Sequence, residues 1–463
     1  MPLVLLASLM ACAPAVDGGQ GITFASQLES PRLNNLTLDL RGDPDFQMSS
    51  LPDEQLHYYR QLWESIEDPH QRSYLARLAQ SDDLYEYGRL VYTHAASLLL
   101  TFRQTGDLRL LDRIDEITEM MRAQLDDSWR DVVRGDTEAG KDGYLNWVFR
   151  YDTGEHTGRD LHEIDEMRTH AFIAEVAWAF RLNEDLESPN GVNYGERANF
   201  WTDYLRNHFE AKWRERNDVP WPNFPFIERP YVHPTIAITK YNYYLHRLTG
   251  ENEYLFEAKR LSDLLFQQFQ MLETEAGPAF VWQRNIPQLG GTAEYLQPTS
   301  YVTYVIADLL SLHLEGFYGW SDPRLPHALS NTVSQFIIDN GSRDFARDIG
   351  GGQRRAGIRA SNPGDWRRLT QSGFGIRTYS FLTAWDLSGT LEQVSKEVWD
   401  SLSSEQNFPF IPAGLFFNEV AGDEIRAELL AIDRTLEGSG DAEDSEAQEE
   451  NELPANANRT DRN

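Results

Sequence analysis

The fold is decided by residues Trp221–Leu264, which read WPNFPFIERPYVHPTIAITKYNYYLHRLTGENEYLFEAKRLSDL. This stretch begins as an aromatic and proline-rich loop and continues as two helices separated by a tight turn at Thr249-Gly250. Pro234 suits the first turn of the first helix, because proline has no amide hydrogen to donate and its fixed φ fits there. Gly250 suits a helix C-terminal cap, where a left-handed residue is favoured. We therefore predict a helical hairpin preceded by a functional loop.

The same helix, turn, helix plan recurs along the chain. Residues 97–121 (SLLLTFRQTGDLRLLDRIDEITEMM) and 242–265 each end one helix in Thr-Gly and begin the next at once. Three looser copies are His170–Asn183 with Glu196–Phe209, Pro298–Gly316 with Leu325–Ile338, and Ile376–Leu387 with Thr390–Leu402. At least five helix pairs with short inner turns and long outer connections favour a closed ring of hairpins, with an open helical solenoid as the alternative.

Composition divides the chain into four segments. Residues 1–12 form a short apolar run with the character of an export signal, too brief to span a bilayer. Residues 13–50 are rich in Gly, Pro, Asn and Ser, which predicts a tether and an extended arm. Helical periodicity then covers residues 51–436. The last segment, 437–463, holds nine acidic and two basic side chains and no aromatic residue, and we expect it to be disordered.

The N-terminal segment also predicts a cellular location. Leu9-Met10-Ala11-Cys12 resembles the lipobox of bacterial lipoproteins, in which the cysteine is lipidated, although the basic residues that usually open such a signal are missing. The resemblance implies a lipoprotein of the outer membrane or periplasm of a Gram-negative bacterium, with plain secretion as the alternative. Cys12 is the only cysteine, so disulfides and thiol catalysis are excluded from the mature domain.

Charge and motifs limit the partners. The formal net charge is −31, and binding of nucleic acid through its phosphates needs a broad basic surface instead. Gly350-Gly351-Gly352 lacks the Lys-Ser/Thr that completes a phosphate loop, and no His-Glu-x-x-His is present. We expect a monomer without a cofactor or catalytic metal, attached to a membrane only through the lipid anchor.

Three predicted inner helices begin with a histidine at similar positions. They are Tyr92-Thr93-His94, Arg168-Thr169-His170 and Tyr231-Val232-His233. In a ring of hairpins these helix ends face the cleft, and a pKa near 6.5 suits histidine for proton transfer. The alternative is that each histidine packs against neighbouring turns. His162, Asp165 and His170 are also a conceivable metal-ligand set, but their spacing is not diagnostic.

Loops that precede these helices supply further candidates. The polar and aromatic residues are Asn146 and Trp147 before His170, Trp221, Asn223 and Tyr231 before His233, and Gln297 and Tyr301 before the helix of the 300s. A basic island within the acidic chain holds Arg354, Arg355, Arg359, Arg367, Arg368 and Arg377 against the single acid Asp365. Because arginine binds carboxylates and sulfates bidentately, this island predicts a loop that binds a polyanion, unless it only pairs with the acidic surroundings.

The repeated helix, Thr-Gly-Asp/Glu turn, helix unit resembles the (α/α) toroids of carbohydrate-active enzymes. With Asn, His, Tyr and Arg at the loop end, the chain is most similar to toroid polysaccharide lyases such as the alginate lyases. The resemblance implies β-elimination on a uronate-containing anionic polysaccharide, in which Asn223 neutralises the carboxylate and His233 or His170 acts as base. Tyr301 would be base or acid, and Arg377 or a neighbour such as Arg355 would bind the carboxylate. The contiguous Asn-Asn-His-x-Tyr-Trp of the best-known pattern is absent.

Three other functions remain open. A toroid glycoside hydrolase would use two of the carboxylates Asp142, Asp165, Glu175, Glu294 and Asp308. A uronate epimerase would share the proton-abstraction step. A non-catalytic surface lipoprotein would hold an anionic polysaccharide or oligosaccharide on aromatic residues without cleaving it.

Overall fold

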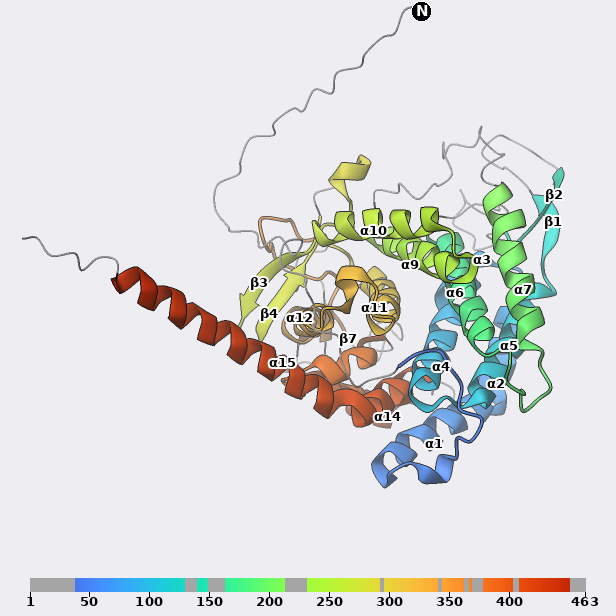
Figure 1. The fold of residues 1–463 in the computed structure, drawn as a ribbon, viewed down its shortest axis with the longest axis horizontal. Helices are drawn as coiled ribbons and strands as arrows, with labels where there is room; N and C mark the ends of the chain where they lie inside the picture. The colour runs from blue at the N-terminus through green and yellow to red at the C-terminus, as the bar shows by residue number, and fades with distance from the viewer. Residues whose placement is uncertain are drawn as a thin grey trace, which may run out of the picture.

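A computed structural model describes most of the chain, and the described part is mostly helical with a few short strands (Figure 1). The described residues are 38–129, 140–148, 163–212, 231–291, 295–339, 344–361, 366–368, 378–402 and 408–449. This content confirms the prediction of a largely α-helical chain.

The helices and strands have the following bounds. The α-helices are α1 (Asp53–Glu67), α2 (Pro69–Ala79), α3 (Leu84–Glu86), α4 (Tyr92–Thr105), α5 (Leu108–Arg122), α6 (Glu163–Leu182), α7 (Tyr194–Tyr204), α9 (Val232–Thr249), α10 (Asn252–Phe266), α11 (Thr299–Leu314), α12 (Arg324–Thr332), α14 (Thr390–Ser401) and α15 (Phe410–Glu449). The π-helical segments are η3 (Tyr87–Val91), η5 (Leu205–Glu210) and η8 (Val333–Ile337), and the 3₁₀ segments are η2 (Met48–Ser50), η6 (Pro287–Leu289), η7 (Tyr318–Ser321) and η10 (Ser380–Trp385). The strands are β1 (Asp126–Trp129), β2 (Gly140–Asn146), β3 (Gln270–Thr274), β4 (Gly277–Val281), β5 (Ile338–Asp339), β6 (Asp344–Ala346) and β7 (Trp366–Arg368).

The helix pairs expected from the repeat are present. α5 packs against α4, α7 against α6, α10 against α9 and α14 against η10. The pair of α11 and α12 is less regular, because α12 packs mainly on β4 and η10. The turn chemistry is the predicted one: Gly106 and Gly250 cap α4 and α9 with φ values of 64° and 74°, and the Asp107 carboxylate accepts the amide hydrogen of Arg109 at the start of α5.

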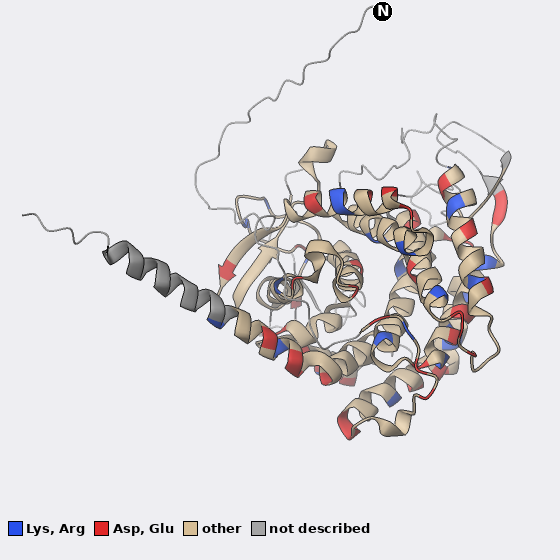
Figure 2. Ribbon diagram, viewed as in Figure 1, with Lys and Arg blue, Asp and Glu red and all other residues tan. Residues whose placement is uncertain are grey.

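The first helices of successive pairs lie next to one another. α4 contacts α6, α6 contacts α9, α9 contacts α11, α11 contacts η10, η10 contacts α15 and α15 returns to α4. Within these contacts the facing sides of the helices are buried almost throughout, as the burial of α6, α9 and α11 shows. Acidic residues are spread along helices that include α1, α7 and α15, as the red segments in Figure 2 show.

The long connections differ from the expectation in containing strands. β1 pairs with β2, β3 pairs with β4, and β5, β6 and β7 form a three-stranded sheet, all antiparallel. The helical periodicity that dominates the sequence gives no sign of these pieces, which are two to seven residues long. Their short hairpins brace the loops at the ends of the helices.

The terminal segments are described in part. In the arm, the buried Leu38 and Leu40 lie against the hairpin turns, where Asn183 donates to the Leu40 carbonyl oxygen at 2.7 Å. Residues 437–449, for which we expected disorder, continue α15 as a helix. Residues 1–37, with Cys12, and 450–463 lie outside the described part.

Candidate functional site

The structure brings four predicted residues together at the N-terminal ends of α9 and α11. Tyr231 and His233 come from the start of α9, and Gln297 and Tyr301 from the start of α11. Backbone hydrogen bonds fix the intervening segment: the amide of Val232 donates to Arg284, that of Arg284 to Tyr295, and that of Gln297 to Trp282. Arg284 thereby joins the group. We name Tyr231, His233, Arg284, Gln297 and Tyr301 the α9–α11 cluster.

The rings of the cluster are stacked. The imidazole of His233 lies 4.4 Å from the ring of Tyr301 and 5.8 Å from that of Tyr231, and both pairs are nearly parallel. The guanidinium carbon of Arg284 lies 4.7 Å from the centre of the Tyr231 ring and 5.5 Å from that of Tyr301. Tyr231, Arg284 and Tyr301 are partly exposed. A ligand at this surface therefore meets two phenol groups and one cation.

Beneath these side chains lie two buried polar groups. His233 and Gln297 are both 0% exposed, and their side chains interact through a hydrogen bond whose geometry falls short of an ordinary one. Burial, together with the charges of Arg284 and Arg168, lowers the pKa of His233 well below its usual value, although the contact with Gln297 opposes this, so the ring is neutral. Poorly satisfied buried polar atoms are rare in folded proteins and call for a water, an ion or a functional role.

His170 occupies a different environment from His233. Its Nδ1 lies 2.7 Å from the carbonyl oxygen of Glu166, its Nε2 lies 3.0 Å from the hydroxyl oxygen of Tyr204, and its ring stacks on Phe209 at 3.7 Å. The ring is buried, which lowers its pKa well below the usual value. With both nitrogens engaged, the geometry favours packing over proton transfer. His94 is also buried, beside Phe410, and burial lowers its pKa to about 3.

Trp147 and Asn146 do not form a sugar-binding surface. Trp147 is 1% exposed, donates from Nε1 to the carbonyl oxygen of Met121 and packs among Tyr87, His170 and Tyr204. Asn146 is buried and donates to the carbonyl oxygen of Asp126. In this structure both side chains are buried and anchor the β1–β2 hairpin to its neighbours, an arrangement that favours a packing role over the predicted contact with a sugar.

Several candidates lie outside the described residues. These are Trp221, Asn223 and Arg377, together with His162 of the conceivable metal set and the side chains of Asp142 and Glu294. In the basic island, Arg354 and Arg359 are exposed. Arg355 is half-buried, donates from Nε to the carbonyl oxygen of Gly350 and covers the ring of Phe336 at 4.4 Å. Its guanidinium therefore supports the glycine loop, which leaves Arg354 and Arg359 as the exposed described charges of the island.

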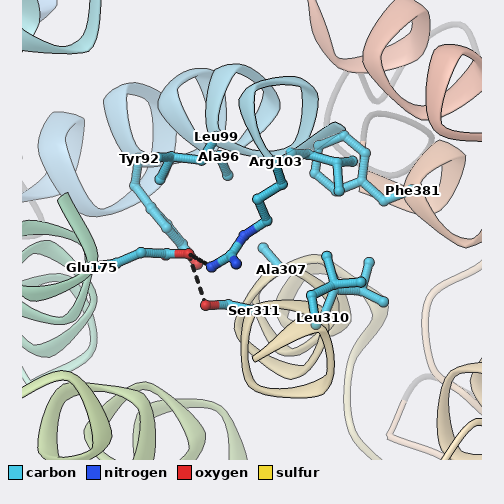
Figure 3. Close-up of a pocket in the computed structure, with 11 residues that line it drawn as sticks. Tyr92, Ala96, Leu99, Arg103, Glu175, Ala307, Leu310, Ser311 and Phe381 are labelled. Atoms are coloured by element: carbon cyan, nitrogen blue, oxygen red, sulfur yellow. Dashed lines mark hydrogen bonds and ion pairs between the residues drawn. The ribbon is translucent and has the colours of Figure 1, made fainter. Parts of the chain in front are cut away.

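Carboxylates proposed for a hydrolase are engaged in buried ion pairs. Asp165 binds Arg89, with Nε and Oδ1 2.8 Å apart. Lys240 lies 2.8 Å from Asp308 and 3.1 Å from Glu175, and Glu175 also binds Arg103 and accepts from Ser311 (Figure 3). The neighbouring cations overcome burial and lower the pKa of Glu175. Each of these three carboxylates is therefore occupied by a buried cation, an arrangement that favours a structural role over that of a glycosidase pair.

Sequence reasoning missed Arg284. It follows the buried Phe280, Val281 and Trp282 of β4 and its continuation, and nothing in this segment resembles a binding motif. The only sequence feature that distinguishes Arg284 is its positive charge directly after an apolar strand. In the structure, the segment that follows this strand lies beside the start of α9. Among the described residues no carboxylate forms an ion pair with Arg284, whereas Arg89, Arg103 and Lys240 each have one.

Metal-binding clusters and membrane-spanning helices are absent from the described residues. Among the described residues, no three His, Cys, Asp or Glu side chains gather as a metal site would require. None of the described helices combines the length and apolarity needed to cross a membrane. Comparison of the chain with protein-family models, with curated proteins and with solved structures found no match.

Proposed function

We propose that the chain folds as an (α/α) toroid and acts as a polysaccharide lyase on a uronate-containing glycan. The cycle of contacts from α4 through α6, α9, α11, η10 and α15 back to α4 supports the ring, and α1, which packs on α15, belongs to its closing hairpin. The N-terminal ends of α9 and α11 would then lie at one mouth of the ring, where the α9–α11 cluster would meet the glycan.

The observation that carries the proposed chemistry is the unpaired cation Arg284 between two partly exposed phenols, Tyr231 and Tyr301. A uronate loses its C5 proton readily only when a positive or hydrogen-bonding group neutralises its carboxylate. Arg284 supplies a fork of donors for that carboxylate. It takes the role that the family resemblance gave to Asn223 and Arg377.

Tyr301 is the cluster's proton-transfer group in this proposal. Acting as a phenolate, its oxygen takes the C5 proton and becomes a hydroxyl, while the C5–H electron pair forms the C4–C5 double bond and the C4–O bond breaks; the hydroxyl then gives its proton to the leaving oxygen, which restores the phenolate. Tyr231 offers a ring face on which a sugar can stack. His233, neutral and behind the ring of Tyr301, positions that ring by stacking; it acts as base only if the tyrosine rings part.

A second candidate function is binding without cleavage. It is favoured by the complete burial of His233, which leaves the tyrosine hydroxyls as the partly exposed proton-transfer groups of the described cluster. A surface protein that captures acidic glycans would need only Arg284 and the tyrosine rings.

The experiment that separates these functions is a screen of the purified protein against alginate, glucuronan, hyaluronan and other uronans. A lyase generates an unsaturated uronide, so ultraviolet absorbance rises with time. New reducing ends without that absorbance would indicate a hydrolase, and exchange of the C5 proton with deuterium from the solvent without cleavage would indicate an epimerase. Glycan binding with none of these changes would reject the lyase in favour of a binding protein.

A further inference from the structure

Arg168, on the first turns of α6, is a buried cation in an aromatic setting. It is 0% exposed, and its guanidinium carbon lies 3.6 Å from the centre of the Tyr304 ring and 4.5 Å from that of Tyr92. One nitrogen, Nη1, donates to the carbonyl oxygen of Gly88. The two ring faces and this single hydrogen bond hold the group in one orientation.

The rest of the guanidinium is unused. Nε and Nη2 of Arg168 have no hydrogen-bond partner among the described residues, and no described carboxylate forms an ion pair with it. The neighbouring acids are already committed, Asp165 to Arg89 and Asp308 to Lys240. A buried charge left without a partner is costly, so such a group marks a place for an anion.

The local backbone is built to present Arg168 in this way. Gly88 lies in the π-helical segment η3, and a Cβ added there would lie 2.6 Å from the carbonyl oxygen of Asp165. Only glycine lets η3 approach α6 so closely. π-helical segments inside longer helices are frequent at functional sites, and here the segment directs the Gly88 carbonyl oxygen at Nη1.

Arg168 also belongs spatially to the α9–α11 cluster. Tyr304, which stacks on its guanidinium, meets Tyr301 edge to face at 6.0 Å. The charge of Arg168 is among the causes that lower the pKa of His233. The ring contacts of Tyr301 with Tyr304 and with His233 therefore connect Arg168 to the α9–α11 cluster.

We propose that Arg168 is an internal binding site for the carboxylate of an acidic saccharide. Nε and Nη2 lie on the same edge of a guanidinium and offer two parallel donors, the arrangement that binds a carboxylate bidentately. Because Arg168 is enclosed, Tyr301 and Tyr304 must shift to admit the ligand. A small cavity bounded by Arg89, Thr303 and Tyr304 adjoins the Tyr304 ring. The inference rests on the proposed function for the class of ligand.

The test is calorimetric titration of the full chain with sodium glucuronate, with sodium sulfate and with neutral glucose. Wild-type protein should bind glucuronate, should bind sulfate more weakly and should not bind glucose. Arg168→Met should weaken glucuronate binding roughly tenfold to hundredfold, the loss expected for a charge-assisted bidentate pair. Arg168→Lys keeps the charge without the fork and should show an intermediate loss, and Arg260→Met, on the exposed side of α10, should bind as the wild type does.

Each result decides the proposal. Absence of glucuronate binding by the wild type, equal binding of glucuronate and sulfate, or unchanged binding by a folded Arg168→Met would overturn it. If Arg168→Met does not fold, the wild-type titrations and Arg168→Lys still decide. Glucuronate binding that depends on Arg168 in a protein that cleaves no uronan would support this site while rejecting the lyase. Uronan cleavage together with glucuronate binding that is unchanged by Arg168→Met would support the lyase and reject the site at Arg168.

Discussion

Four buried histidines share one electrostatic property. Burial lowers the pKa of His94, His170, His233 and His313 below the ordinary value, to about 3 for His94 and about 4 for His313. Each ring is therefore neutral in the folded protein near pH 7. This shared property makes the stability of the folded state depend on pH.

We expect the folded state to lose stability as the pH falls. Near pH 6.5 and below, the unfolded chain protonates these histidines while the folded chain does not, so each contributes a loss of about 1.4 kcal/mol per pH unit until its folded pKa is reached. Above pH 7 they contribute no slope. Chemical denaturation from pH 7.5 to 4.5, a window of about three units within this range, should show the decline.

A matched pair of variants checks the origin of the slope. His94→Gln removes one buried titrating ring and should flatten the decline, whereas His57→Gln, exposed on α1, should leave it unchanged. Equal slopes for the wild type and His94→Gln would show that His94 does not resist protonation in the folded protein.

Residue identity alone could not separate the histidines. His170 and His233 stand at equivalent places in the repeat, yet His170 has both nitrogens engaged by Glu166 and Tyr204, whereas His233 has only a poorly formed contact with Gln297. Tyr204 and Gln297 lie 34 and 64 positions away in sequence, which local pattern does not reveal. The burial of Trp147 was unpredictable for the same reason, since its partners come from α3–η3, α5 and α7.

At the scale of elements, the turns between paired helices are not equivalent. Gly106 and Gly250 both cap a helix in the left-handed conformation. A Cβ at Gly106 would lie 2.5 Å from the amide nitrogen of Asp43 in the N-terminal arm, whereas a Cβ at Gly250 would meet nothing within 4 Å. The arm's backbone hydrogen bond to Gly106 explains the crowding, because the amide of Asp43 donates to the Gly106 carbonyl oxygen at 2.8 Å.

The pair Gly106→Ala and Gly250→Ala measures how tightly the arm is docked. Gly250→Ala should cost only the strain of a left-handed alanine, about 1 kcal/mol of unfolding free energy. Gly106→Ala adds a clash with the arm and should cost clearly more, by urea denaturation. Equal costs would mean that the arm yields freely at Asp43.

The turns were predictable because their signals are local. Thr-Gly-Asp at 105–107 contains its own cap and its own helix start, so five helix pairs could be read from the chain. The short strands and the extension of α15 could not, because backbone pairing across loops and tertiary packing leave no period in so few residues. The same limit applies to Arg284, whose place is set by backbone bonds to Val232 and Tyr295.

At the scale of the molecule, the buried charged residues fall into two groups that differ in whether they have ion-pair partners. Lys240 pairs with Asp308 and Glu175, and Glu175 also pairs with Arg103, between α4, α6, α9 and α11; Figure 3 shows Glu175 and Arg103. Arg168 and Arg284 have no described acid to bind, although the chain as a whole carries a formal net charge of −31. Two unpaired arginines beside one set of tyrosines in an acidic protein are what the proposed binding of an anionic ligand requires.

The most direct test compares uronan cleavage by the wild type, Tyr301→Phe and Tyr318→Phe, followed by ultraviolet absorbance of the unsaturated product. Tyr318 is an exposed tyrosine of η7 whose hydroxyl donates to Asp263, outside the cluster, and serves as the matched control. Removing one hydroxyl that transfers protons should lower kcat about a hundredfold or more in Tyr301→Phe, with unchanged helical circular dichroism. Tyr318→Phe should cleave as the wild type does. Cleavage by Tyr301→Phe at the wild-type rate, or no absorbance rise with any uronan, would contradict the proposed lyase mechanism.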